Sequence, residues 1–290
     1  MDILAESPPL PEGPSSHPGR AFRPSAGWAL GLLLALASRL PAAPAGEPDA
    51  SAEEPGRDAA RRVEFVAADK VRIAADFHVP AEGGAVFVLL HGLGAGRGEW
   101  GTFSALLAER GWGSLALDAR GHGESGGPRY TTFDEPEDWA KIEMDLAAAV
   151  KFLDGEGIPP RRVVLAGASI GANLALRAAV RQPAVPFAIL LSPGYDYQGI
   201  LIREPVLAFD RPLIMAASLN DPYALRSAEV VSHFLRHRES WLLRAVSGHG
   251  VGMLEGRENR AFVRELMKRI EEKVAAKIFP SSPSEKPTSP

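Results

Sequence analysis

Short apolar segments alternate with helix-like segments through the middle of the chain. Two apolar segments come first, at residues 63–66 and 71–79, and the polar residues between them predict two antiparallel strands joined by a tight turn. The pattern then predicts strands at 85–90, 113–117, 163–166, 187–191, 213–217 and 241–246, and helices at 100–110, 138–154, 172–181, 223–237 and 257–273. Strands that are apolar throughout are buried on both faces, as in a parallel sheet between helices. We therefore predict an α/β fold with a mostly parallel sheet of about eight strands, opened by the antiparallel hairpin and covered by helices on both faces.

The segments before and after this region differ from it in composition, so we place one folded domain at residues 62–278. Residues 46–61 consist mainly of proline, alanine, aspartate and glutamate and predict a flexible linker. Residues 279–290 are rich in proline and serine and predict a disordered tail.

The first 45 residues have the order of a secretory signal peptide. Arg20 and Arg23 precede an apolar segment at 28–37, and Ala43 and Ala45 offer a small-residue cleavage site. The apolar segment is about ten residues long, too short to cross a bilayer core of roughly 30 Å as a helix. We therefore expect an exported protein, periplasmic or secreted, with no stable membrane span. The long leader with its acidic residues keeps two alternatives open, an uncleaved membrane anchor and a buried apolar helix in a cytoplasmic protein.

The composition excludes several classes of function. A formal net charge of -4 over 290 residues gives no general attraction to nucleic acid or to an anionic membrane surface. The chain has no cysteine, which excludes disulfides, thiolate catalysis, Cys-ligated metal sites and a lipid anchor on a processed cysteine. We expect a small-molecule partner and no nucleic acid.

The most informative motif lies where the strand at 163–166 meets the helix at 172–181. Gly167, Ser169 and Gly171 belong there to the pattern G-x-S-x-G. Such a turn holds its serine in a strained conformation, and it needs glycines because side chains at those positions would collide with the adjoining strand or helix. We interpret Ser169 as a candidate nucleophile; the alternative is a tight connection with an incidental serine.

A serine nucleophile needs a base, normally a histidine that a carboxylate holds in the right tautomer. His249 follows the last predicted strand between two glycines, and we interpret it as the base. Asp221 follows the strand at 213–217 and lies between Ser169 and His249 in the chain, which is the order expected when the nucleophile occupies such a turn. Asp221 also precedes a proline at a predicted helix start, so helix capping is its alternative role. Asp196 and Asp210 are the alternative carboxylates.

Two backbone N–H groups are the predicted donors to the oxyanion of the reaction. One belongs to Ile170, directly after the nucleophile, and the other to Leu93, in the glycine-rich turn that follows His91. We interpret His91 as a structural hydrogen-bonding residue, and His122 as part of a turn that braces the same edge of the sheet.

These residues resemble those of an α/β-hydrolase fold enzyme. The resemblance covers about residues 62–275 and rests on the segments 91–94, 118–125, 167–171 and 247–250 together with Asp221. It is greatest to serine aminopeptidase-like and monoglyceride-lipase-like esterases, which share the pattern D-x-R-G-H-G-x-S. The resemblance implies no metal and no organic cofactor.

We therefore expect a serine hydrolase that acts on carboxylic esters with small or medium acyl groups, through an acyl-enzyme. An aminopeptidase or thioesterase of the same fold is one alternative, and Glu124, Glu135 and Glu137 are the candidate carboxylates for a substrate α-amine. A non-catalytic binding protein of this fold is the other.

The segment at 192–212 is where many such enzymes insert a cap domain. At this length a full helical lid does not fit, so we expect little or no cap. The apolar residues of the segment form either a short flap or part of the core; they are Tyr195, Tyr197, Ile200, Leu201 and Ile202.

Overall fold

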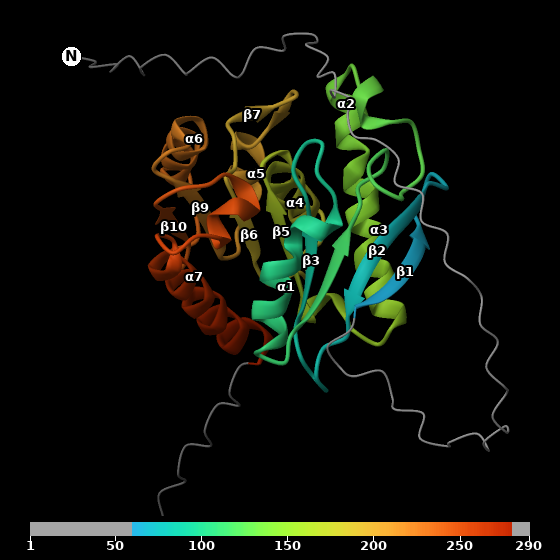
Figure 1. Ribbon diagram of the computed structural model, residues 1–290, viewed down its shortest axis with the longest axis horizontal. Coiled ribbons are helices and arrows are strands. Elements are labelled where there is room, and N and C mark those ends of the chain that lie inside the picture. The colour runs from blue at the N-terminus through green and yellow to red at the C-terminus, as the bar shows by residue number, and fades with distance from the viewer. Residues whose placement is uncertain (1–59, 280–290) are drawn as a thin grey trace, which may run out of the picture. The chain divides into compact units, whose positions relative to one another are not determined.

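The computed structural model describes residues 60–279 (Figure 1). The predicted signal peptide, most of the predicted linker and all but the first residue of the predicted tail lie outside the described residues. Within residues 60–279, no helix is long and apolar enough to cross a membrane.

An eight-stranded sheet forms the centre of the structure, in the order β1-β2-β4-β3-β5-β6-β9-β10. The strands are β1 (Arg61–Val66), β2 (Arg72–His78), β3 (Val86–Leu90), β4 (Gly113–Leu117), β5 (Val163–Ala168), β6 (Ala188–Leu191), β9 (Leu213–Ser218) and β10 (Trp241–Ala245). Strand β2 pairs antiparallel with both β1 and β4, and all other pairs are parallel. The predicted fold class, with its antiparallel opening hairpin, is confirmed.

Helices cover both faces of the sheet (Figure 1). They are α1 (Gly101–Ala108), α2 (Pro136–Ala140), α3 (Ile142–Gly155), α4 (Ile170–Val180), α5 (Arg203–Ala208), α6 (Pro222–Ser232) and α7 (Arg260–Lys273). Short 3₁₀ turns occupy Arg97–Trp100, Tyr130–Thr132, Pro160–Arg162 and Gly250–Leu254, and a π-helical turn occupies Val274–Ile278. Side chains of α3 and α4 belong to one core cluster, and those of α1 and α7 belong to the other.

Strand β3 shows why the apolar segments predicted this arrangement. Val86, Val88 and Leu90 belong to the core cluster under α3 and α4, whereas Phe87 and Leu89 belong to the cluster under α1 and α7. All five side chains are buried, because successive residues of a strand point to opposite faces and both faces are covered.

Two predicted helices differ from the structure. The predicted helix at 138–154 is divided into α2 and α3, and the predicted helix at 223–237 ends at Ser232.

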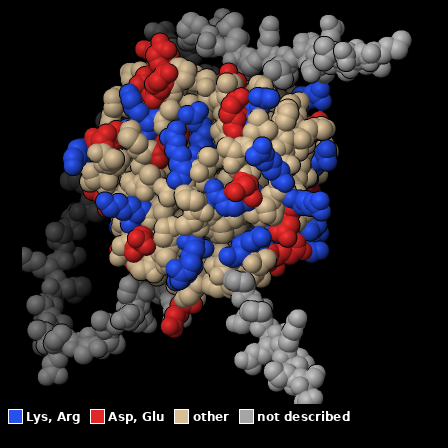
Figure 2. All heavy atoms as spheres, turned by 180° about the vertical axis from the view of Figure 1, so that it is seen from behind, with Lys and Arg blue, Asp and Glu red and all other residues tan. Residues whose placement is uncertain are grey.

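The surface on the back of the molecule is mixed in charge. Figure 2 shows basic and acidic side chains interspersed over this face.

The segment at 192–212 forms a small hairpin, β7 (Asp196–Tyr197) and β8 (Ile200–Leu201), followed by the short helix α5. Both interpretations of its apolar residues hold in part. Ile200 and Ile202 are buried in the core, whereas Leu201 is 41% exposed. The described residues contain no helical lid at this position, in agreement with the expectation from its length.

Candidate active site

Ser169 occupies a strained turn between β5 and α4. Its backbone has φ 56° and ψ -126°, a left-handed conformation that costs energy for any residue other than glycine. A Cβ atom at Gly167 would overlap the carbonyl of Gly171, and one at Gly171 would overlap the carbonyls of Leu90 and His91. These close approaches are the physical reason for both glycines of the motif.

Two loops flank this turn. A Cβ atom at Gly92 would lie 3.2 Å from Cβ of Ser169, and one at Gly250 would lie 3.1 Å from Cβ of Ala168. The structure therefore brings the glycine-rich turn after β3 and the histidine loop after β10 to the Ser169 turn, as expected for the carboxyl ends of parallel strands.

His249 and Asp221 are in direct contact, with 2.5 Å between Nδ1 of His249 and Oδ2 of Asp221. An Nδ1–H that donates to the carboxylate leaves Nε2 as the basic nitrogen of the ring. The imidazole is half exposed, whereas the carboxylate is largely buried. Burial acts to raise the pKa of Asp221, but the hydrogen bonds from His249 and from the N–H of Ala224 hold it below its ordinary value.

The same carboxylate also caps helix α6. Its Oδ1 accepts the N–H of Ala224 at 3.2 Å, while Oδ2 contacts His249. The two roles that the sequence set against each other are therefore compatible, one on each oxygen. The alternative carboxylates lie elsewhere: Asp196 accepts the N–H of Gly199 in the β7–β8 hairpin, and Asp210 is exposed beside Arg211.

His91 orients the peptide that precedes Leu93. The N–H of Ala119 donates to Nε2 of His91 at 3.0 Å, so the ring carries its proton on Nδ1 and donates to the carbonyl of Gly92 at 2.7 Å. The C=O and N–H of a trans peptide point in opposite directions, so the N–H of Leu93 is directed away from the imidazole. Burial lowers the pKa of His91 to about 4, which keeps the ring neutral.

The predicted oxyanion donors are available. In the described part of the chain, the N–H groups of Leu93 and Ile170 donate no hydrogen bond to another residue. Ile170 is the first residue of α4, where backbone N–H groups lack partners within the helix and favour negative charge. A site for a developing oxyanion beside Ser169 requires two such donors.

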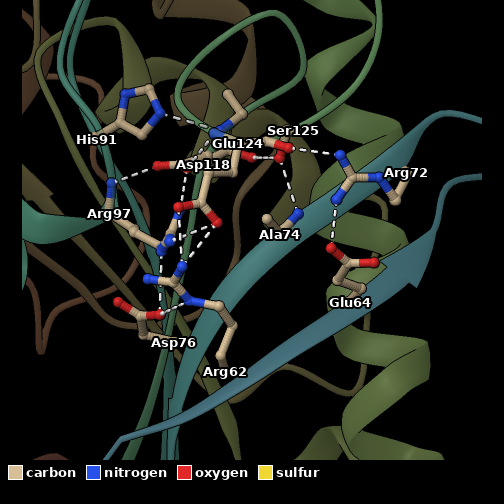
Figure 3. Close-up of polar contacts among 11 residues, drawn as sticks. Arg62, Glu64, Arg72, Ala74, Asp76, His91, Arg97, Asp118, Glu124 and Ser125 are labelled. Atoms are coloured by element: carbon tan, nitrogen blue, oxygen red, sulfur yellow. Dashed lines mark hydrogen bonds and ion pairs between the residues drawn. The ribbon is translucent and has the colours of Figure 1, made fainter.

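An ion network around the buried side chains of Arg97 and Asp118 fixes the segment that follows the glycine-rich turn after β3 (Figure 3). Asp118 accepts the backbone N–H of Arg97 at 2.8 Å and that of Glu124 at 2.9 Å, and it also pairs with the Arg97 guanidinium. The guanidinium further contacts Asp76 at 3.0 Å and Glu124 at 3.1 Å. The network joins the glycine-rich turn after β3, the turn after β4 and strand β2.

The turn after β4 is fixed by further contacts. The hydroxyl of Ser125 donates to the carbonyl of Asp118 at 2.7 Å and accepts the N–H of Ala74 at 2.9 Å. His122 stacks on Tyr130 with 4.1 Å between ring centroids. His122 therefore contributes packing to this edge of the sheet, in line with the interpretation from sequence.

Tyr197 is a site residue whose role the sequence did not indicate. Its hydroxyl donates to the carbonyl of Ser192 at 3.3 Å, and a polar contact with Ser169 acts to lower its pKa. Burial, together with the nearby charge of Asp221, raises the pKa of this phenol. Because Tyr197 lies in a hairpin after β6, no strand pattern directs its side chain toward the nucleophile.

Ser192 was also missed. It has φ 51°, is fully buried and accepts the N–H of Gly250 on its hydroxyl at 2.9 Å. Ser192 could have been identified from its position directly after β6, because the other candidate residues also follow the ends of their strands. Ser192 connects the β6 edge to the loop that carries His249.

Glu99 is the third residue that sequence reasoning missed. Its Oε1 accepts the N–H of Gly92 at 3.2 Å. Burial raises the pKa of its carboxyl, while the hydrogen bond from Gly92 and the charge of His249 act to lower it. Glu99 therefore contacts the glycine-rich turn from seven residues further along the chain, a spacing that no motif specifies.

In residues 60–279 no group of three or more His, Asp or Glu side chains is arranged to hold a metal ion. Independence from metals and organic cofactors stays a prediction from the family resemblance.

Comparison with known proteins gives one family and many similar folds. The sequence model described as "Alpha/beta hydrolase family" matches residues 87–278. The structure is similar to that of DcsB in complex with its substrate analogue, at 14% identity over 75% of this chain and 100% of that chain, with a TM-score of 0.65. An esterase from Pyrococcus furiosus is similar at 20% identity over 76% and 91% of the two chains, with a TM-score of 0.57. A dienelactone hydrolase from Anabaena variabilis is similar at 15% identity over 73% and 98%, with a TM-score of 0.60.

Proposed function

Because the chain belongs to the alpha/beta hydrolase family, we propose that it is a serine-dependent hydrolase of carboxylic esters, with Ser169 as nucleophile, His249 as base and Asp221 orienting the base. The observation that carries the proposal is the contact of 2.5 Å between His249 and Asp221, at the edge of the sheet where Ser169 occupies its strained turn. A serine with no chemical role would not require such a turn.

The reaction proceeds through an acyl-enzyme. Nε2 of His249 takes the proton of Ser169 Oγ as the oxygen attacks the ester carbonyl, and the imidazolium is stabilised by Asp221. The N–H groups of Leu93 and Ile170 hold the oxyanion of the tetrahedral intermediate. His249 then gives its proton to the departing alcohol, and a water molecule activated by the same residue releases the acid.

Esters with small or medium acyl groups are the proposed substrates. The described residues provide a short hairpin and one short helix where a cap domain would lie, so the walls of the site are low. Several of the similar structures are those of esterases, among them the Pyrococcus furiosus protein, and this supports ester hydrolysis over the other reactions of the fold.

The test is hydrolysis of p-nitrophenyl acetate and butyrate by the full chain and by Ser169→Ala. We expect the substitution to abolish measurable turnover and to abolish labelling by a fluorophosphonate probe. Ser232→Ala, on helix α6, is the matched control and should keep both. Equal rates for the unaltered protein and Ser169→Ala would contradict the proposal.

Two alternatives give different results in the same assays. An aminopeptidase needs a carboxylate for the substrate amine; of the three that the sequence suggested, Glu124 is held by Arg62 and Arg97, and Glu135 and Glu137 are exposed. A panel of matched amide, thioester and ester substrates separates these activities. A non-catalytic binding protein would show neither turnover nor labelling at Ser169.

We also propose export, on the sequence alone. Cleavage after Ala45 would give a mature protein that begins at Gly46, and N-terminal sequencing of protein from the native host tests it. An intact Met1 would contradict cleavage.

A further inference from the structure

Glu99 differs from the other shielded carboxylates of the structure in having no basic partner. Among the others, Asp118 pairs with Arg97, Asp145 with Arg120, Glu143 with Arg177 and Arg181, and Asp221 with His249. Glu99 is half-buried, yet no lysine or arginine of residues 60–279 lies within 4.0 Å of its carboxylate. Its environment disfavours the charged form without supplying a cation to offset that cost.

The nearest cation along the chain is unavailable to it. Arg97 is only two residues away, but its guanidinium is buried among Asp76, Asp118 and Glu124 (Figure 3). Three carboxylates therefore already share this one cation, and its side chain is 8% exposed. A change of partner toward Glu99 would leave the buried carboxylate of Asp118 without its cation.

The carboxylate lies where substrate chemistry takes place. Its Oε1 accepts the N–H of Gly92, the residue before the proposed oxyanion donor Leu93, and Gly92 lies against the nucleophile, since a Cβ atom there would be 3.2 Å from Cβ of Ser169. Its other oxygen accepts no hydrogen bond from any residue in the described ranges. A negative charge beside an oxyanion site opposes the negative charge that develops there, unless a positive group neutralises it.

We propose that Glu99 binds a positively charged group in the alcohol part of the substrate, so that the enzyme prefers esters whose leaving group carries an ammonium. This inference rests on the proposed ester hydrolysis. The alcohol side is assigned because His249 must reach the departing oxygen to protonate it, and helix α1, which begins two residues after Glu99, contacts the 3₁₀ turn Gly250–Leu254 that directly follows His249. The ammonium of such an alcohol would lie beside the free oxygen of the carboxylate.

The test compares acetylcholine with 3,3-dimethylbutyl acetate, which has the same shape but a carbon in place of the charged nitrogen. At pH 8 and low ionic strength we expect kcat/KM to be about tenfold higher for the cation, an effect that salt reduces. Glu99→Gln keeps an oxygen for the N–H of Gly92 but removes the charge. We expect it to bring the ratio of the two substrates close to one and to raise the rate with the neutral ester, because the repulsion of the oxyanion is lost.

Glu82→Gln is the matched control, because Glu82 is exposed in the loop between β2 and β3 at the opposite edge of the sheet. It should keep the preference for the cation. Equal kcat/KM for the two esters in the unaltered protein, or a preference that survives Glu99→Gln, would overturn this inference alone. Failure to hydrolyse either ester, with no fluorophosphonate labelling of Ser169, would overturn the proposed function together with it.

Discussion

His91 donates a hydrogen bond of 2.7 Å from Nδ1 to the carbonyl of Gly92, the carbonyl of the peptide whose N–H belongs to Leu93. One imidazole thereby sets the direction of a proposed oxyanion donor without contacting the substrate. Its own orientation is set by the N–H of Ala119, which donates to Nε2 from the turn after β4. The glycine-rich turn and the turn after β4 therefore act as one unit.

Removal of this imidazole should impair turnover more than substrate binding. We expect His91→Ala to lower kcat for p-nitrophenyl butyrate about 10- to 100-fold with a small change in KM, because a misdirected donor no longer meets the oxyanion. Steady-state kinetics of this variant and of His78→Ala, at the opposite end of the sheet, check the effect. A loss confined to KM, or equal losses in both variants, would contradict the role given to His91.

The buried imidazole also makes stability depend on pH. Burial lowers the pKa of His91 to about 4, against about 6.5 for an unfolded chain. Between these values the unfolded state binds a proton that the folded state does not bind, so the free energy of unfolding falls as pH falls from 6.5 to 4, by up to about 3 kcal/mol. Urea titrations from pH 7.5 to pH 4.5 should show this contribution as a difference between the unaltered protein and a variant without the His91 imidazole.

His122, whose pKa is also lowered by burial, acts with the same sign, whereas Asp145, whose pKa burial raises to about 6, acts with the opposite sign. His91→Gln isolates the share of His91, because the curve of this variant should be flatter than that of the unaltered protein. Titration of the His91 ring by NMR gives a direct reading. A midpoint near 6.5, or parallel stability curves, would be inconsistent with a neutral buried ring.

Much of the site could be predicted because parallel strands end at one edge of the sheet. Asp221 and His249 follow β9 and β10, and the structure brings them into contact although 28 positions separate them. Glycine at 167 and 171 was predictable for a steric reason, which the close backbone approaches at both positions bear out. In each case the residue's place relative to a strand end determines where it lies.

Other features depend on contacts that no local pattern specifies. Glu99 lies in a 3₁₀ turn and Tyr197 in a two-residue strand, where sequence spacing does not determine the direction of a side chain. The break between α2 and α3 falls at Lys141, in a stretch without glycine or proline, so the sequence reads as one helix. The end of α6 at Ser232 has no breaking residue either.

Asp221 offers a way to separate catalysis from folding. Asp221→Asn keeps an oxygen for the N–H of Ala224 but removes the charge that orients and stabilises His249. We expect kcat to fall about 10³- to 10⁴-fold with the free energy of unfolding little changed, whereas Asp221→Ala should also lose about 1 kcal/mol of stability with the helix cap. Kinetics and denaturant titrations of both variants check this. Retention of activity in Asp221→Asn would assign the residue to capping alone.

The hydroxyl of Tyr197 provides the last prediction, because it donates to the carbonyl of Ser192 and its pKa responds to both Asp221 and Ser169. In an acyl-enzyme the Ser169 oxygen is the leaving atom, and a hydrogen bond to it would favour its departure. Tyr197→Phe removes only the hydroxyl, since the ring that packs on Gly194 remains. We expect kcat to fall about tenfold, with stopped-flow traces showing a larger burst of p-nitrophenol because deacylation slows while acylation persists. Tyr195→Phe, in the same hairpin segment, is the control and should keep the burst of p-nitrophenol and the kcat of the unaltered protein. A variant with the same burst and kcat as the unaltered protein would limit Tyr197 to packing, because only its hydroxyl would have been removed.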